Sequence, residues 1–190
     1  MTRTEIIQNF IDKHRYKKYL EIGVFRNENF NAIRCEYKVS VDPDPEAHAT
    51  VCSTSDCFFN NCEEKFDIVF IDGLHEHNQV WRDINNSLKY LNKDGVIVMH
   101  DCMPRSEHAA RWDNKSHQNE EWNGDVWKAY YKAYNELPYK VYVIPEDYGC
   151  GIIDTSKAKL NLMHEIDMEK LEYSDYINIK KTNNYGVKYE

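Results

Sequence analysis

The chain has 190 residues, of which 42% are hydrophobic and 29% charged, and this size and composition fit one globular domain. Its 24 Lys and Arg residues against 32 Asp and Glu residues give a net charge of -8, which argues against a nucleic-acid partner. No apolar run approaches the roughly 20 residues that span a bilayer, and the N-terminus lacks a secretory signal pattern. We therefore expect a cytoplasmic protein with no membrane partner.

Helices and short strands alternate along the first half of the chain. Thr2 and Glu5 have the spacing of a capping box ahead of an apolar stripe, which predicts a first helix ending near His14. Phe30 and its apolar neighbours predict a second helix. Apolar runs bounded by turn residues predict four strands, at 19–22, 37–41, 50–52 and 66–71.

The second half continues this alternation around one long polar segment. Apolar residues at helical spacing predict a helix over 78–91, and a strand follows at 96–99. The polar stretch 103–123 is longer than an ordinary connection, which makes it a candidate functional loop. A helix is expected between Gly124 and Pro138. Two further strands, 139–144 and 150–153, are expected to form a hairpin.

The order of these elements predicts an α/β fold. Because right-handed crossovers place helices above and below a parallel sheet, we expect a doubly wound, mostly parallel seven-stranded sheet with a C-terminal antiparallel hairpin. Residues 1–155 form the predicted domain, and residues 156–190 are expected to be an extension packed on it. Within that extension, apolar residues between Leu160 and Leu171 suggest a short helix.

Ligands of such sheets bind outside the carboxyl ends of the strands, so the residues that follow each strand are the candidate site. Those residues are Glu21, Gly23, Asp42, Ser55, Asp56, Asp72, His75, His100 and Asp101. An acidic rim of this kind is a poor cradle for a pyrophosphate group. The segment after the first strand also has one glycine where the dinucleotide fingerprint needs three, which argues against a nicotinamide dehydrogenase.

Asp42 suggests a different nucleoside ligand. An acidic side chain at the end of the second strand can accept hydrogen bonds from both hydroxyl groups of a ribose. The alternative for Asp42 is a turn-forming role before Pro43, and for Gly23 it is a purely structural strand-to-helix turn.

The segments LEIGVF, SVDPDP, TSDCFF, FDIVFIDGLH, DGVIVMHDC and WNGDVWKAY, in this order, resemble the class I S-adenosylmethionine-dependent methyltransferases over residues 19–155. The resemblance implies a Rossmann-like methyltransferase fold and S-adenosylmethionine as cofactor. It further implies contacts with the methionine moiety, the ribose and the adenine, together with a cofactor contact at Asp72. The residues expected to make these contacts are Glu21 and Gly23 for the methionine moiety, Asp42 for the ribose, and Ser55 and Asp56 for the adenine.

Within that family, the IDGLH segment resembles the small metal-dependent sugar O-methyltransferases and their cephalosporin-hydroxylase-like relatives. This resemblance implies that Asp72 and Asp101 bind Mg²⁺ or another divalent cation and that His75 acts as the catalytic base beside Asp72. His100 stands where the relatives have a carboxylate, so it is expected as a substitute metal ligand. Helix capping is the alternative role for His75, and His77 is expected to point away from it.

These observations favour an O-methyltransferase acting on a hydroxyl group of a carbohydrate or small metabolite. A metal ion can lower the pKa of such a hydroxyl group while a histidine accepts its proton. The alternative is a cofactor-binding or scaffold protein without turnover, suggested by the single glycine and by His100. The acceptor pocket is expected to be open to solvent or to a second subunit, so association into a homo-oligomer is left open.

Overall fold

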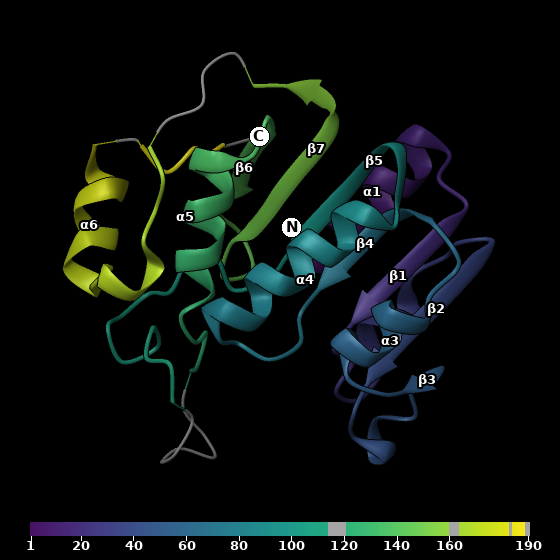
Figure 1. Cartoon of the computed structure of the whole chain (residues 1–190). Coiled ribbons are helices and arrows are strands. Elements are labelled where there is room, and N and C mark those ends of the chain that lie inside the picture. The colour runs from purple at the N-terminus through teal and green to yellow at the C-terminus, as the bar shows by residue number, and fades with distance from the viewer. Residues whose placement is uncertain (114–120, 160–163, 183, 189–190) are drawn as a thin grey trace.

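A seven-stranded sheet runs through the computed structural model, in the order β3-β2-β1-β4-β5-β7-β6 (Figure 1). The structure describes residues 1–113, 121–159, 164–182 and 184–188. Strands β1 to β5 pair in parallel, and β7 runs antiparallel to both β5 and β6, as the sequence predicts. The strands are β1 (Lys18–Ile22), β2 (Tyr37–Asp42), β3 (Val51–Cys52), β4 (Phe66–Ile71), β5 (Leu91–Met99), β6 (Tyr139–Ile144) and β7 (Cys150–Ala158).

The helices alternate with the strands. They are α1 (Arg3–His14), α2 (Glu28–Ala32), α3 (Ser55–Asn61), α4 (His77–Lys89), α5 (Val126–Glu136) and α6 (Tyr173–Lys181), with 3-10 turns η1 (Pro45–Ala47) and η2 (Met168–Lys170). The sequence did not predict α3. The helix suggested between Leu160 and Leu171 is wrong in position, because Ile166 lies in an irregular segment and α6 begins later. Leu160 and Met163 lie outside the described residues.

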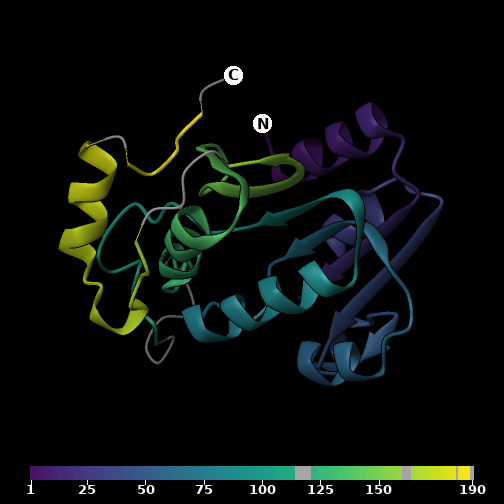
Figure 2. The ribbon, with the colours of Figure 1, turned by 45° about the horizontal axis from the view of Figure 1, so that its top comes forward.

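The two faces of the sheet bury separate hydrophobic clusters because successive strand side chains point to opposite faces. Leu20 and Ile22 pack with Ile84 of α4 in the larger cluster. Tyr19, which directly precedes Leu20 in sequence, packs with Ile7 of α1 in the other cluster. Figure 2 shows α1 on one side of the sheet and α4 on the other. This two-sided burial accounts for the nearly continuous apolar character of the central strands.

The C-terminal segment packs against α5. Tyr176 of α6 and Tyr185 are fully buried, and their rings contact Trp127 and Tyr130 of α5. The Tyr185 hydroxyl group donates a hydrogen bond to the carbonyl oxygen of Cys102, at 2.6 Å. No helix within the described ranges is both long and apolar enough to cross a membrane.

Gly23 allows the loop after β1 to touch the loop after β4. Its φ is +80°, and a Cβ atom there would lie 2.3 Å from the carbonyl oxygen of Asp72 and 2.4 Å from the Cα atom of Gly73. We expect Gly23→Ala to lower the free energy of unfolding by roughly 2 to 5 kcal/mol, since left-handed backbone strain and overpacking add together. Denaturant unfolding measures this loss.

Gly73→Ala is the matched control from the same contact. A Cβ atom on Gly73 would meet its nearest neighbour, Ile22 Cγ2, at an ordinary 3.5 Å. This variant should stay within about 1 kcal/mol of the wild type, because no close contact is created. Equal losses in the two variants would contradict the close approach at Gly23.

Candidate active site

The carboxyl edge of the sheet borders a cavity of about 830 Å³. Loops from non-adjacent parts of the chain meet here because the carboxyl ends of parallel strands lie at one edge. The predicted site residues that line this cavity are Gly23, Asp42, Ser55, Asp72, His75, His100 and Asp101. Two of the predicted site residues, Glu21 and Asp56, do not line it.

Asp42 organises the loop after β1. Its Oδ2 atom accepts hydrogen bonds from the backbone N–H groups of Val24 and Phe25, at 2.9 and 3.3 Å. Its Oδ1 atom accepts one from the N–H of Asp44, at 2.9 Å. Asp42 thus fulfils the turn-stabilising role while its carboxylate borders the cavity. The ribose contact at Asp42 stays a prediction.

Glu21 lies beside the main cavity, in a second one of about 420 Å³ that shares Gly23, Arg3 and Asp72 with it. The Glu21 carboxylate is 2% exposed and accepts hydrogen bonds from the Tyr19 hydroxyl group, at 2.5 Å, and from Asn29 Nδ2, at 3.0 Å. Burial raises the pKa of Glu21 from 4.5 to about 7, although both hydrogen bonds oppose this rise.

This pKa predicts a dependence of stability on pH. The folded chain holds the Glu21 proton more tightly than the unfolded chain does, so this contribution is complete below about pH 4.5 and is lost as the pH rises to about 7. Relative to Glu21→Gln, the wild type should lose on the order of 3 kcal/mol between these limits. Thermal unfolding of both proteins from pH 5 to pH 8 measures the difference, and a constant difference would contradict it.

Ser55 and Asp56 begin α3 but face different surroundings. The Ser55 hydroxyl group lines the cavity and donates a hydrogen bond to Asp83 Oδ1 of α4, at 2.6 Å. The Asp56 side chain is 43% exposed, and its Oδ2 atom pairs with Arg82 Nε at 3.3 Å. The expected adenine contact of Asp56 therefore gains no support from its position.

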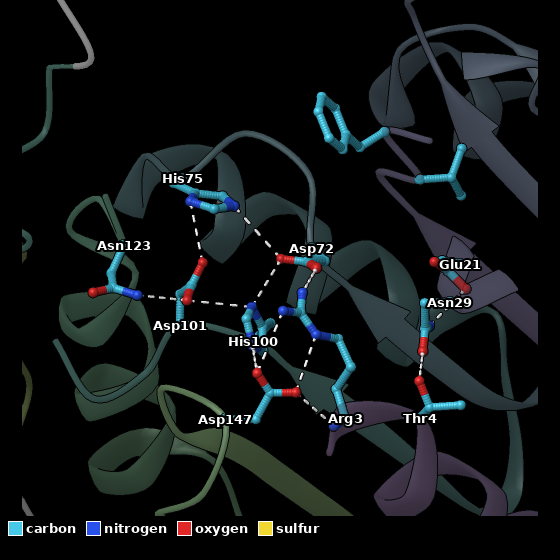
Figure 3. A network of polar contacts seen from close by, with 12 residues as sticks. Arg3, Thr4, Glu21, Asn29, Asp72, His75, His100, Asp101, Asn123 and Asp147 are labelled. Atoms are coloured by element: carbon cyan, nitrogen blue, oxygen red, sulfur yellow. Dashed lines mark hydrogen bonds and ion pairs between the residues drawn. The ribbon is translucent and has the colours of Figure 1, made fainter. Parts of the chain in front are cut away.

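Asp72, His75 and Asp101 converge at the edge of the cavity. Asp72 directly follows β4, His75 lies three residues later, and Asp101 follows β5. His75 Nε2 lies 3.5 Å from Asp72 Oδ1, and His75 Nδ1 lies 3.3 Å from Asp101 Oδ2 (Figure 3). The structure thus brings together the three residues for which the sequence resemblance implied cation-binding and base roles, and those roles stay predictions.

His100 lies among three carboxylates and is 3% exposed. Its Nδ1 atom is 3.2 Å from both Asp72 Oδ1 and Asp101 Oδ1, and its Nε2 atom is 3.4 Å from Asp147 Oδ1. Burial alone would lower the pKa of His100, but these carboxylates outweigh burial and raise it to about 12. A protonated imidazole has no lone pair for a metal, so this arrangement does not favour the predicted ligand role of His100.

Arg3 and Asp147 complete the network, and neither was among the site residues predicted from the sequence. Arg3 Nη1 donates a hydrogen bond to Asp72 Oδ2 at 2.7 Å, and Arg3 Nε donates to Asp147 Oδ2 at 3.2 Å (Figure 3). The Arg3 backbone N–H also donates to Asp147 Oδ2, at 2.7 Å. The first turn of α1 is thereby tied to the turn between β6 and β7. No local pattern in the sequence predicts this contact.

Opposite charges adjust the pKa values of the cluster. Burial would raise the pKa of Asp72, but His100 and His75 outweigh burial and lower it well below its usual range. Burial would lower the pKa of His75, but Asp72 and Asp101 outweigh burial and raise it. The side-chain hydrogen bond with His100 and the contact with Arg3 lower the pKa of Asp147. At neutral pH Asp72 and Asp147 are therefore ionised.

The segment before α5 covers His75. The Trp122 ring stacks on the His75 ring, with centroids 4.9 Å apart, and Asn123 Nδ2 donates a hydrogen bond to Asp101 Oδ1 at 2.6 Å. Gly124 has φ +64°, and a Cβ atom there would lie 2.0 Å from the carbonyl oxygen of His75. The latter part of the predicted functional loop thus fixes the position of His75. Residues 114–120 of that loop lie outside the described residues.

His77 faces away from this group, as predicted. Its Nδ1 atom lies 2.6 Å from Asp125 Oδ2, and its Nε2 atom lies 3.1 Å from Glu169 Oε1. These contacts join the start of α4 to α5 and η2. His77 therefore has a structural role outside the cavity.

The donor set of Asp72, His75 and Asp101 fits a divalent cation. One potential ligand atom from each residue lies within 4.8 Å of the others. The Nδ1 atom of His75 is buried and has no hydrogen-bond partner, although Asp101 Oδ2 is near it. Carboxylate oxygens suit Mg²⁺ and Mn²⁺, and an added imidazole ligand suits Zn²⁺ or Fe²⁺. The two carboxylates could therefore hold a cation, with His75 either as a third ligand or beside it.

The sequence matches a family of known domains. Residues 26–102 match the family model described as a methyltransferase domain. That range runs from the loop after β1 through Asp72, His75 and Asp101. No curated protein matches the sequence.

Solved structures resemble the chain over most of its length. An O-methyltransferase from Bacillus cereus in complex with SAH has 16% identity and a TM-score of 0.57, and the match covers 83% of this chain and 80% of that one. A SAH-bound methyltransferase from Podospora anserina has 17% identity and a TM-score of 0.62, with 83% and 78% covered. The O-methyltransferase TomG from Streptomyces achromogenes, in complex with SAM, has 13% identity and a TM-score of 0.59, with 80% and 79% covered.

At these identities the structural likeness shows a shared fold. The domain match is a separate comparison, and it includes Asp42, Ser55, Asp72, His75 and Asp101 of the residues that border the cavity. Together they agree with the resemblance that the order of the motifs indicated: residues 26–102 match a methyltransferase domain, and the chain has the fold of the class I S-adenosylmethionine-dependent methyltransferases.

Proposed function

We propose that the chain transfers the methyl group of S-adenosylmethionine to a hydroxyl oxygen of a carbohydrate or another small metabolite. A divalent cation held by Asp72 and Asp101 assists the transfer, and His75 acts as the general base. The convergence of Asp72, His75 and Asp101 on a cavity that Gly23 and Asp42 also line is the observation that supports this proposal. The O-methyltransferases among the structural relatives support the cofactor and the oxygen acceptor.

The expected chemistry assigns a separate task to each group. S-adenosylmethionine supplies a methyl group bonded to a positively charged sulfur atom, so the chain has to orient the acceptor and remove its proton. The acceptor oxygen forms the new bond to carbon, the bond between carbon and sulfur breaks, and the hydroxyl proton passes to His75. A cation on Asp72 and Asp101 would lower the pKa of that hydroxyl group.

Aromatic and polar side chains together favour a carbohydrate acceptor. Trp122 and Tyr148 line the cavity alongside His75, Asn123 and Asp101. A sugar ring presents apolar faces to aromatic rings and hydroxyl groups to polar ones. A small metabolite with a single hydroxyl group is the alternative acceptor.

Transfer of an isotopically labelled methyl group tests the proposal. We expect label from S-adenosylmethionine to appear on oxygen in at least one member of a panel of mono- and oligosaccharides and phenolic alcohols. EDTA should abolish the transfer, and Mg²⁺ or another divalent cation should restore it. A rate that EDTA leaves unchanged would remove the cation from the proposal and retain His75 as the base.

Absence of transfer in spite of cofactor binding would favour the non-catalytic alternative. Our remaining expectations rest on the sequence alone. They are a cytoplasmic location and a lack of nucleic-acid and membrane partners. Association into a homo-oligomer is also left open.

A further inference from the structure

Ser55 and Asp83, which are buried, and Gln79, which is half-buried, form a hydrogen-bonded polar group in the wall of the main cavity. The methyl transfer proposed above uses none of these side chains for chemistry. Asp83 lies on α4 and is 1% exposed, so an ionised carboxylate there needs hydrogen-bond donors. Two donors are present, and both come from side chains that also line the cavity.

The two donors approach one oxygen atom of Asp83. Ser55 Oγ donates to Asp83 Oδ1 at 2.6 Å, and Gln79 Nε2 donates to the same atom at 3.0 Å. Gln79 Nε2 also donates to Ser55 Oγ, at 3.1 Å. Within the described ranges, every hydrogen bond that Asp83 accepts reaches Oδ1, so Oδ2 keeps its lone pairs. The carboxylate is therefore held in place with one acceptor atom left for a ligand.

Asp56, the acidic residue for which an adenine contact was expected from the sequence, has a different environment from Asp83. Asp56 is 43% exposed and pairs with Arg82. Asp83 faces the cavity and has no ion pair among the described residues. Burial raises the pKa of Asp83 to about 6, against the hydrogen bonds from Ser55 and Gln79. At pH 8 the carboxylate is ionised and accepts hydrogen bonds only.

We propose that Asp83 selects the adenine base of the cofactor, with Asp83 Oδ2 accepting a hydrogen bond from the exocyclic amine and Ser55 and Gln79 holding the carboxylate. This inference rests on the proposed function and assigns a specificity-determining residue within its cofactor site. The apolar side chains of Ile22, Val41 and Leu74 line the same cavity and supply surface for the flat base. An acceptor at this place excludes a base whose amine is replaced by a carbonyl oxygen.

Calorimetry at pH 8 with two ligands tests the selection. S-adenosylhomocysteine carries the amine, and S-inosylhomocysteine carries a carbonyl oxygen in its place. The wild-type protein should bind the adenine ligand at least about tenfold more tightly, because the inosine ligand sets two acceptors against each other. This measurement needs no variant, and a ratio near one would overturn the proposal.

The Asp83→Asn variant tests the residue itself. Asparagine can keep an oxygen atom facing Ser55 and Gln79 while presenting an amide donor where Oδ2 lies. The preference for adenine should fall by at least about tenfold, since a donor now faces the amine and suits the carbonyl oxygen. Asp56→Asn is the control and should leave the ratio of the two affinities unchanged.

The outcomes separate this inference from the proposed function. Equal weakening of both ligands by Asp83→Asn would show that Asp83 acts only by joining α3 to α4, and would overturn the selection. Failure of the wild type to bind either ligand would overturn the proposed function, and the adenine site with it. Adenine preference that persists in Asp83→Asn would place the selectivity elsewhere and overturn the role of Asp83.

Discussion

Replacement of His75 by glutamine should lower the rate of methyl transfer by about 10²- to 10⁴-fold, the usual contribution of a general base. The side chain lines the cavity between Asp72 and Asp101 and lies under the Trp122 ring. Glutamine can fill much of the same space and form hydrogen bonds, but it cannot take up a proton. Single-turnover kinetics measures the rate, and calorimetry with S-adenosylhomocysteine should show an unchanged affinity.

His77→Gln is the matched control for this variant. His77 also lies between two carboxylates, those of Asp125 and Glu169, but it does not line the cavity. We expect it to lower the free energy of unfolding and to leave the rate near that of the wild type. A His75→Gln enzyme that keeps its rate would contradict the base. If His75→Gln lost cation affinity together with its rate, His75 would be a metal ligand rather than the base.

Replacement of Asp72 by asparagine should weaken the binding of a divalent cation by about 100-fold or more, since even an outer-shell partner contributes about 10- to 100-fold. Asp72 is one of the two carboxylates in the group that could hold the cation, so the variant removes one of the two negative charges there. The rate of transfer should fall by a similar factor when the cation is limiting. Titration with Mn²⁺, followed by electron paramagnetic resonance, measures the affinity directly.

Asp147→Asn is the control that separates the loss of a cation ligand from the loss of a negative charge beside Arg3 and His100. Asp147 contacts Arg3 and His100, as Asp72 does, but it lies outside the group that could hold the cation. We expect Asp147→Asn to retain cation affinity. Parallel losses in the two variants would mean that Asp72 acts through Arg3 and His100, and would count against the cation site.

Much of the fold could be predicted because strands that are buried on both faces of a sheet are apolar at nearly every position. The run Phe66–Ile71 is apolar at nearly every position, and it forms β4 over the predicted range. Helix α3 was missed because its seven residues carry no helical periodicity, and a hydrogen bond from Cys57 N to the Thr54 hydroxyl group starts it. Only Tyr176 is buried in α6, so tertiary packing rather than an apolar stripe determines where that helix lies.

The candidate site was predictable where it depends on the ends of parallel strands. Asp42 is the last residue of β2, and Asp72 and Asp101 follow β4 and β5, so the topology alone brings them to one edge. Arg3 and Asp147 could not be found in this way, because their contact joins positions 144 residues apart in the sequence. The chemistry of His100 was also beyond the sequence, since its environment depends on three carboxylates from separate segments.

The loop after β1 shows why a count of glycines is a poor guide here. Besides Gly23, the residues Phe25 and Asn27 have positive φ values, of 47° and 63°. Asparagine tolerates this conformation better than most residues. Asn27 Nδ2 also donates hydrogen bonds to the carbonyl oxygens of Ala47 and His48, at 3.0 and 2.8 Å. The side chain of Asn27 therefore ties the loop after β1 to the end of η1, and this loop forms without a second glycine.

Titration of the protein with S-adenosylhomocysteine, followed by isothermal calorimetry, tests most directly whether the carboxyl edge of the sheet is a cofactor site. We expect saturable binding at one site and an affinity at least about tenfold weaker in Asp42→Asn, since a lost charged hydrogen bond costs about 1.5 to 3 kcal/mol. Absence of binding at millimolar ligand, or binding that Asp42→Asn leaves unchanged, would contradict it.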